Sequence, residues 1–171
     1  MPDDLKIIYY PDPRLKRMSQ PVTQFDPDLR DLVVQMLRLM REHRGVGLAA
    51  PQVGKNLRLF VMNPSGEAGD DQVYINPVLS DGESDEEAEE GCLSLPDIHV
   101  KVVRNKKMKI QAQDLEGNPF VETGTGFITR VWQHEFDHLN GILLTDRMGP
   151  VAKMQNRKKL KELEDRYNAR R

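Results

Sequence analysis

A helical pattern of apolar residues stands out between residues 26 and 44. Apolar side chains recur there at intervals of three and four residues and so share one helix face. They are Leu29, Leu32, Val33, Met36, Leu37 and Met40. Asp26 can accept hydrogen bonds from the first free backbone N–H groups, and Pro27 fits the first helical turn. Because Gly45 is a natural stop, we predict a helix that begins at Asp26 and ends at Gly45.

Apolar runs bounded by turn residues predict strands in the middle of the chain. Residues 57–63 and 73–79 are two such runs, separated by a loop rich in glycine and aspartate. Residues 97–114 predict two more strands around a turn near Asn105. The glycines of residues 45–54 are expected to interrupt regular structure.

Two further helices are predicted in the last third of the chain. Residues 124–141 have a helical pattern that stops at Asn140 and Gly141, and residues 149–171 predict a C-terminal helix. Prolines around Asp12 favour a short helix near the start. The order helix, strands, helix indicates an α+β fold, in which short antiparallel strands pack around a central helix.

Length and charge set the broad class of the protein. A chain of 171 residues is typical of one domain. We therefore expect a single domain over residues 1–171, with residues 150–171 as a C-terminal basic helix. The net charge of −2 excludes nucleic-acid binding by bulk electrostatics, DNA included. Residues 81–90 contain seven acidic side chains, which is typical of a solvated loop.

The single cysteine and the N-terminal stretch bear on the compartment. Cys92 has no partner for an internal disulfide, which fits a reducing compartment and leaves the thiol for metal binding or catalysis. Residues 1–17 contain no apolar run long enough for a signal peptide or a membrane span. We expect a cytoplasmic protein that does not bind membranes.

The stretch WQHEFDHLNG, residues 132–141, carries the clearest chemical signal. His134 and His138 are four residues apart on a predicted helix, so their Cβ atoms lie about 5–6 Å apart and both imidazoles can hold one divalent ion. Glu135 can reach a water molecule on that ion rather than the ion itself. The alternative is a helix with two surface histidines at this spacing by chance. A third ligand decides between them.

Several residues are candidates for the third ligand. A further histidine six residues after His138 would extend the pattern, but that position is occupied by Leu144. Glu162 and Glu164 lie among lysines and arginines, where a solvated role is expected. Cys92 follows a glycine in EGCLSLP, and a thiolate with two imidazoles leaves one tetrahedral position for water, as a catalytic site requires. The alternative for Cys92 is a small buried hydrophobe.

Three motifs together resemble those of the peptide deformylases, in the same order and over nearly the whole chain. They are GVGLAAPQ at residues 45–52, EGCLS at residues 90–94 and QHEFDHLNG at residues 133–141. The resemblance implies one divalent metal ion, Fe(II) in the native enzyme, with Zn, Ni or Co as alternatives. The ligands that it implies are Cys92, His134 and His138.

The resemblance also assigns roles in the reaction. The enzymes of this family remove the formyl group from the N-terminal methionine of nascent polypeptides, by attack of metal-bound hydroxide on the formyl carbon. Glu135 is then the general acid and base. Gln52 and the backbone N–H of Leu93 stabilise the oxyanion. The backbone around Gly45 and Gly47 pairs with the substrate as an added strand.

An apolar pocket is required for the methionine side chain. Phe127 and Val131 lie on the same predicted helix face as His134, and with Val46 they are our pocket residues. The alternative is that Phe127 and Val131 belong to the core. Arg130 either borders this pocket with its methylene stem or points into solvent. Glu90 is expected to pair with Arg104 and so hold the cysteine loop.

Two other functions compete with deformylation. An endopeptidase with the same H-E-x-x-H motif generally uses a third histidine or glutamate, and Cys92 argues against it. A non-enzymatic domain with a structural zinc usually has four protein ligands, and the sequence offers no fourth.

The C-terminal helix has two interpretations. Residues 151–171 carry eight Lys or Arg and three Asp or Glu, a local net charge of +5. Met154, Leu160, Leu163 and Tyr167 predict a narrow apolar seam that docks on the body, with the basic residues outward. The helix either aids solubility alone or, as the resemblance implies, binds ribosomal RNA near the exit tunnel.

Overall fold

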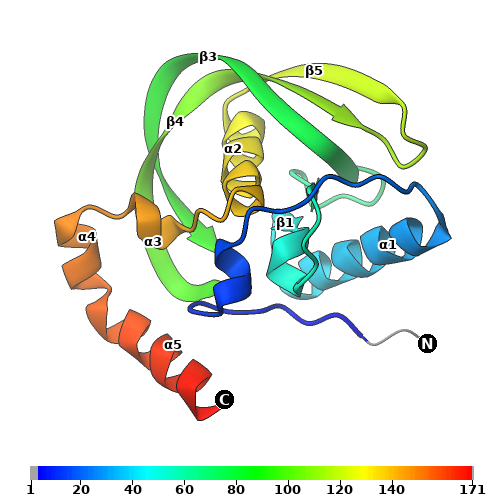
Figure 1. Cartoon of the computed structure of the whole chain (residues 1–171). Coiled ribbons are helices and arrows are strands. Elements are labelled where there is room, and N and C mark those ends of the chain that lie inside the picture. Colours follow the sequence, from blue (N-terminus) through cyan, green and yellow to red (C-terminus); the bar gives the residue numbers. More distant parts are fainter. Residues whose placement is uncertain (1–3, 171) are drawn as a thin grey trace.

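One antiparallel sheet of five strands wraps around a helix over residues 4–170, which the computed structural model describes (Figure 1). Chain order is kept across the sheet, from β1 (Gly47–Ala49) through β2 (Leu59–Met62), β3 (Gln72–Cys92) and β4 (Leu95–Gln113) to β5 (Pro119–Thr125). The enclosed helix is α2 (Phe127–Leu139). The predicted α+β fold with antiparallel strands around a central helix is confirmed.

The length of β3 and β4 corrects the prediction of short strands. They span 21 and 19 residues. The acidic run at residues 81–90 lies within β3 instead of a loop, and Asn105 lies within β4 instead of a turn. Opposite charges on the paired strands explain this, because acidic β3 side chains meet basic β4 side chains, as where Lys107 lies 3.4 Å from Glu83.

The glycine-containing stretch before β2 is also more regular than predicted. It forms β1 and a 3-10 helix, η2 (Ala50–Val53). Within the described part of the chain, β1 pairs with β2 alone and lies at one end of the sheet order. The other edge of β1 therefore has no strand beside it among the described residues, although the N–H of Ala49 donates to Oε1 of Gln52.

Helix α1 (Pro27–Glu42) begins as predicted and ends earlier. The Asp26 carboxylate accepts a backbone N–H at 3.0 Å, so the predicted N-cap is confirmed. The helix ends at Glu42, and Arg44 takes the left-handed conformation with φ 57°. Gly45 follows this turn and donates its N–H to the carbonyl of Met40 at 2.8 Å. Arg44, rather than Gly45, thus makes the turn that ends the helix.

Helix α2 packs its apolar face into the concave side of the sheet. Trp132 is 1% exposed and lies in the core. Its ring meets that of Tyr74 edge-on at 5.9 Å, and Tyr74 stacks on Phe60 of β2. The predicted end of the helix is also confirmed, since Gly141 adopts φ 73° directly after Asn140.

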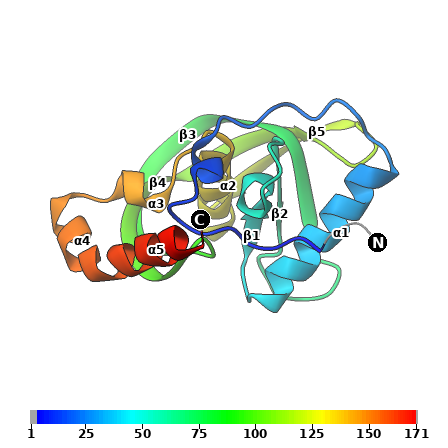
Figure 2. The ribbon, with the colours of Figure 1, turned by 60° about the horizontal axis from the view of Figure 1, so that its bottom comes forward.

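The predicted C-terminal helix is divided into two helices, and a further short helix that was not predicted precedes them. In chain order, the three are α3 (Leu144–Arg147), α4 (Pro150–Gln155) and α5 (Arg157–Ala169). α4 lies at the end of the molecule away from α1, and α5 runs back from α4 toward the middle of the molecule (Figure 2). Leu163 is buried against Leu95 and Ile98, and Leu160 packs beside it, but Met154 is 78% exposed and does not belong to the predicted seam. None of the described helices is long and apolar enough to span a membrane.

A 3-10 helix, η1 (Pro13–Lys16), precedes α1. Asp12 caps it by accepting the N–H of Arg14 at 2.9 Å, which confirms the short helix predicted near Asp12.

Candidate metal centre

Helix α2 and the hairpin of β3 and β4 bring three ligand-type side chains together. His134 and His138 share one face of the helix, with ring centroids 5.1 Å apart. Cys92 is the last residue of β3, directly before a tight turn into β4. Its Sγ lies 3.4 Å from Nε2 of the buried His138. The three residues that the sequence points to therefore converge.

The spacing of these atoms fits one metal ion. Sγ of Cys92 and the ring nitrogens of the two histidines lie within 4.8 Å of one another, and residues 4–170 contain no other such group of three. Atoms bound to one tetrahedral ion at about 2.0–2.3 Å are about 3.5 Å apart. Three protein ligands of this kind leave a fourth position for water or substrate.

The charges around the histidines also suit a cation. Burial lowers the pKa of His138 well below its ordinary value, so this imidazole is neutral and has a free lone pair. Burial acts in the same direction on His134, but Glu135, Cys92 and Glu90 together raise its pKa above the ordinary value. The surroundings of His134 thus favour a positive charge, which a bound cation would supply.

A buried network of charged side chains orients His134. Its Nδ1 lies 2.9 Å from Oε1 of Glu90, which leaves Nε2 for a metal. Arg104 donates from Nη2 and Nε to the two oxygens of Glu90, both at 2.9 Å, so the predicted ion pair is confirmed. Arg104 also donates to Asp137 at 2.7 Å, and Arg147 donates to the other oxygen of Asp137 at 2.7 Å.

The electrostatics of Glu90 follow from this network. Burial acts to raise its pKa, but the hydrogen bonds from Arg104 and His134 outweigh burial and hold the pKa well below its usual range. Glu90 is therefore ionised and accepts hydrogen bonds only.

Glu135 is a buried carboxyl beside the ligands. Its side chain is 5% exposed, and Oε2 lies 4.0 Å from Nε2 of His134. Burial raises the pKa of Glu135 to about 7. Oε1 has no hydrogen-bond partner among the described residues. A carboxyl with this pKa can both accept and release a proton near neutral pH.

Gln52 is held with its amide nitrogen toward Cys92. Its Oε1 accepts the backbone N–H of Ala49 at 2.9 Å, so Nε2 faces the other way. Nε2 donates to Oγ of Ser94 at 3.1 Å and lies 3.5 Å from Sγ of Cys92. Leu93 follows Cys92 in the turn. Both predicted oxyanion donors are therefore close to the cysteine.

The glycines before and in β1 permit close packing against the site. A Cβ on Gly47 would lie 2.6 Å from Oε2 of Glu135, and a Cβ on Gly45 would lie 2.7 Å from Cδ1 of Leu93. Val46, between them, is 38% exposed.

The two pocket candidates on α2 differ in their surroundings. Phe127 begins the helix and is 55% exposed, so it does not belong to the core. Val131 is 6% exposed and packs in the core cluster with Phe60 and Trp132.

From the sequence, Arg130 could either border the methionine pocket or point into solvent. It is 7% exposed and donates hydrogen bonds to Glu90 and to two backbone carbonyls. The partners come from β3 and β4. Four-residue spacing from His134 was the signal that placed it near the ligands.

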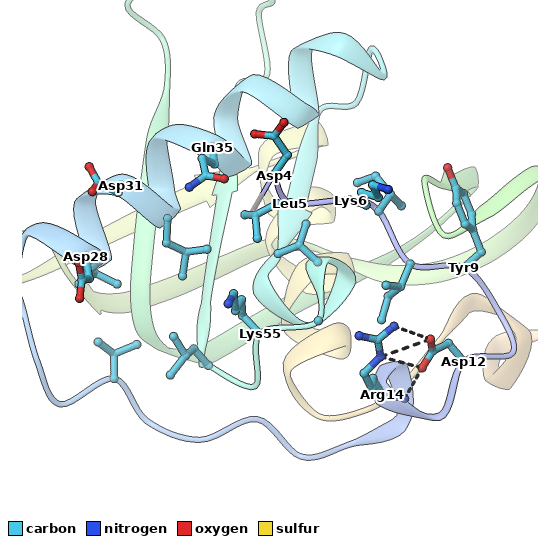
Figure 3. A pocket seen from close by; sticks show the side chains of 18 of the residues that line it. Asp4, Leu5, Lys6, Tyr9, Asp12, Arg14, Asp28, Asp31, Gln35 and Lys55 are labelled. Atoms are coloured by element: carbon cyan, nitrogen blue, oxygen red, sulfur yellow. Dashed lines mark hydrogen bonds and ion pairs between the residues drawn. The ribbon is translucent and has the colours of Figure 1, made fainter. Parts of the chain in front are cut away.

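A large groove lies elsewhere, between the N-terminal segment, α1 and the end of α5. Figure 3 shows the side that the N-terminal segment and α1 line. Asp28, Asp31 and Gln35 line it from α1. Arg14 lines it too and pairs with Asp12 at 2.8 Å. None of the three ligand-type residues lines this groove, so we assign the chemistry to the metal centre.

Comparison with known proteins agrees with this site. A sequence profile described as polypeptide deformylase matches residues 4–154. The chain belongs to the polypeptide deformylase family. A peptide deformylase of Thermotoga petrophila is 43% identical over 160 residues, which cover 92% of this chain and 95% of that relative. Metal-dependent deformylation is the known activity of the family, so the predicted enzyme class is confirmed.

Solved structures of deformylases share the fold. A plant peptide deformylase, PDF1B, superposes with a TM-score of 0.94 at 39% identity, covering 99% of this chain and 94% of the plant chain. A peptide deformylase from Legionella pneumophila superposes with a TM-score of 0.90 at 41% identity, covering 99% of both chains.

Proposed function

We propose that this chain removes the formyl group from the N-terminal methionine of newly made polypeptides, with the metal centre as its active site. The observation that carries this proposal is the convergence of Cys92, His134 and His138 within 4.8 Å. Glu135 lies beside them as a buried carboxyl that is not part of the ligand group.

Cys92 through Sγ and the two histidines through Nε2 would hold a divalent ion. Such an ion lowers the pKa of a water molecule and polarises the formyl carbonyl. Fe(II) is our proposal for the native ion, and the same nitrogen and sulfur donors also accept Zn, Ni or Co.

Glu135 moves the proton in this proposal. Its carboxylate takes a proton from the attacking water as the oxygen adds to the formyl carbon, and then passes that proton to the leaving amine. The carbon–nitrogen bond breaks, and formate and a free amino terminus result. Nε2 of Gln52 and the N–H of Leu93 donate to the formyl oxygen as negative charge builds on it. One such donor typically contributes about 2.7–4 kcal/mol.

The free edge of β1 would hold the substrate backbone as an added strand. Gly47 lies against Glu135, so a peptide paired with this edge runs past the metal centre. Val46, Phe127 and Val131 would form the apolar pocket for methionine. Gly45 keeps the backbone close to Leu93.

We also propose that the exposed basic face of α5 binds ribosomal RNA. The helix has one buried residue, Leu163, and its arginines and lysines are exposed. Binding to ribosomal RNA would bring the enzyme close to polypeptides as they emerge from the ribosome. We propose that this takes place in the cytoplasm.

Formate release from formyl-Met-Ala-Ser tests the function. Formyl-Met peptides should be cleaved much faster than the matched acetyl-Met peptide, because an added methyl group clashes beside the formyl carbon. Formyl-Gly peptides should be slower because burial of the methionine side chain, worth about 1.5–3 kcal/mol, is lost. Casein cleavage without formate release would favour the endopeptidase and overturn the proposal.

A further inference from the structure

Arg130 joins α2 to both strands of the hairpin that carries Cys92. Nη1 donates to Oε2 of Glu90 at 2.6 Å and to the carbonyl of Val102 at 2.9 Å. Nη2 donates to the carbonyl of Glu86 at 2.6 Å. Glu86 and Glu90 belong to β3 and Val102 to β4. The guanidinium therefore has partners in three directions, as its planar fork of donors allows.

Arg130 and His134 share one carboxylate. Oε1 of Glu90 lies 2.9 Å from Nδ1 of His134, and Oε2 accepts from Nη1 of Arg130. The two residues are four apart on α2, so both reach Glu90 from the same helix face. Arg104 also donates to both oxygens of Glu90, so Oε2 is held by Arg104 and Arg130 together. The position of Oε1, and with it the orientation of the imidazole, depends on both arginines, and Arg130 makes the shorter contact with Oε2.

We propose that Arg130 is a positioning residue for the metal centre, acting through Glu90 to fix the ring of His134 and thereby increasing affinity for a divalent ion. This rests on the metal site of the proposed function. Groups that hold the second nitrogen of a metal-ligating histidine typically change metal affinity by about 10–100-fold.

A purely architectural role for Arg130 can be separated from this one. Arg58 holds the other end of α2, donating to the carbonyl of Leu139 and to Oδ1 of Asn140, both at 3.0 Å. It has no hydrogen bond to Glu90 or His134. Arg58→Met therefore removes a comparable anchor of the same helix without touching the ligand shell.

Zn²⁺ affinity, measured by competition with a chromophoric chelator, is the readout. Arg130→Met should weaken binding by about ten-fold, the lower end of the range for a group that contacts the histidine directly. Arg130→Lys keeps the charge but cannot reach three acceptors at once, so its affinity should fall between the two. Arg58→Met should stay within about three-fold of the wild type. A folded Arg130→Met or Arg130→Lys protein with unchanged affinity would overturn the inference.

A double-mutant cycle with Glu90→Gln shows whether Arg130 acts through Glu90. In the Glu90→Gln background, Arg130→Met should weaken Zn²⁺ binding by less than about three-fold. An equal loss in both backgrounds would make Arg130 a helix anchor and contradict the inference. A wild-type chain that binds Zn²⁺ but releases no formate would overturn the proposed function and leave this inference standing.

Discussion

Each residue of the centre is held by partners that are distant along the chain. Gln52 meets Cys92 and Ser94, and His134 meets Glu90 across 44 residues. The proximity of His134 and His138 was predictable from the sequence, because residues four apart on a helix share one face. The burial of Arg130 was not predictable, because its partners lie on a strand that is distant along the chain.

Gly47 gives a test at the residue scale. Gly47→Ala places a methyl group 2.6 Å from Oε2 of Glu135, so the carboxylate must move. We expect kcat on formyl-Met-Ala-Ser to fall by at least about ten-fold, a loss of at least about 1.4 kcal/mol in stabilisation of the transition state. Gly149→Ala is the matched control, because its Cβ would meet nothing within 4 Å. Equal kcat for both variants would show that Gly47 does not shape the site.

At the scale of elements, those that depend on local sequence features were predicted better than those that depend on long-range pairing. α1 was predicted well because its cap and its apolar stripe are local features. β3 and β4 were predicted as shorter pieces because the acidic run looks like a solvated loop by itself. Its basic partners on β4 became apparent only once the strands were paired, as Lys107 with Glu83 shows.

Glu90 links three elements, and its removal should destabilise their packing. Glu90→Gln removes the negative charge between the buried side chains of Arg104 and Arg130 and leaves Arg104 with Asp137 as its anionic partner. This change should cost about 3 kcal/mol in the free energy of unfolding of the metal-free protein. Glu86→Gln is the control on the same strand. Its pair with Lys106, 3.6 Å apart, is exposed and should contribute less than about 1 kcal/mol. Chemical denaturation measures both, and similar losses would contradict the assigned role.

The same substitution should change the response of stability to acid. Because the folded pKa of Glu90 lies below its ordinary value of 4.5, its stabilising effect is complete above that pH. The effect is lost as pH falls below 4.5 toward the folded pKa. The unfolding free energy of Glu90→Gln should therefore fall less steeply in this acid range than that of the wild type. Parallel curves would show that Glu90 is not held as an anion.

At the scale of the whole molecule, basic charge is concentrated near the C-terminus while the chain as a whole carries −2. Reversing the exposed charges at Arg157, Lys158 and Lys161 to glutamate should weaken ribosome co-sedimentation by about ten-fold or more at low salt. Activity on a short formyl peptide should stay unchanged, because these side chains are exposed and none of them belongs to the metal centre. Lys109→Glu on β4 is the control, and equal effects would contradict a specific dock.

Cys92 and the two histidines are proposed to bind the metal ion, while Glu135 is proposed to move the proton without binding the ion. One paired measurement tests this separation of roles most directly. Glu135→Ala should retain about one metal ion per chain, by elemental analysis, yet lose at least about 100-fold in formate release, because no group remains to move the proton. Cys92→Ala, measured beside it, should lose the ion as well as the activity. Loss of the ion in Glu135→Ala, or a tightly bound ion with full activity in Cys92→Ala, would contradict the account.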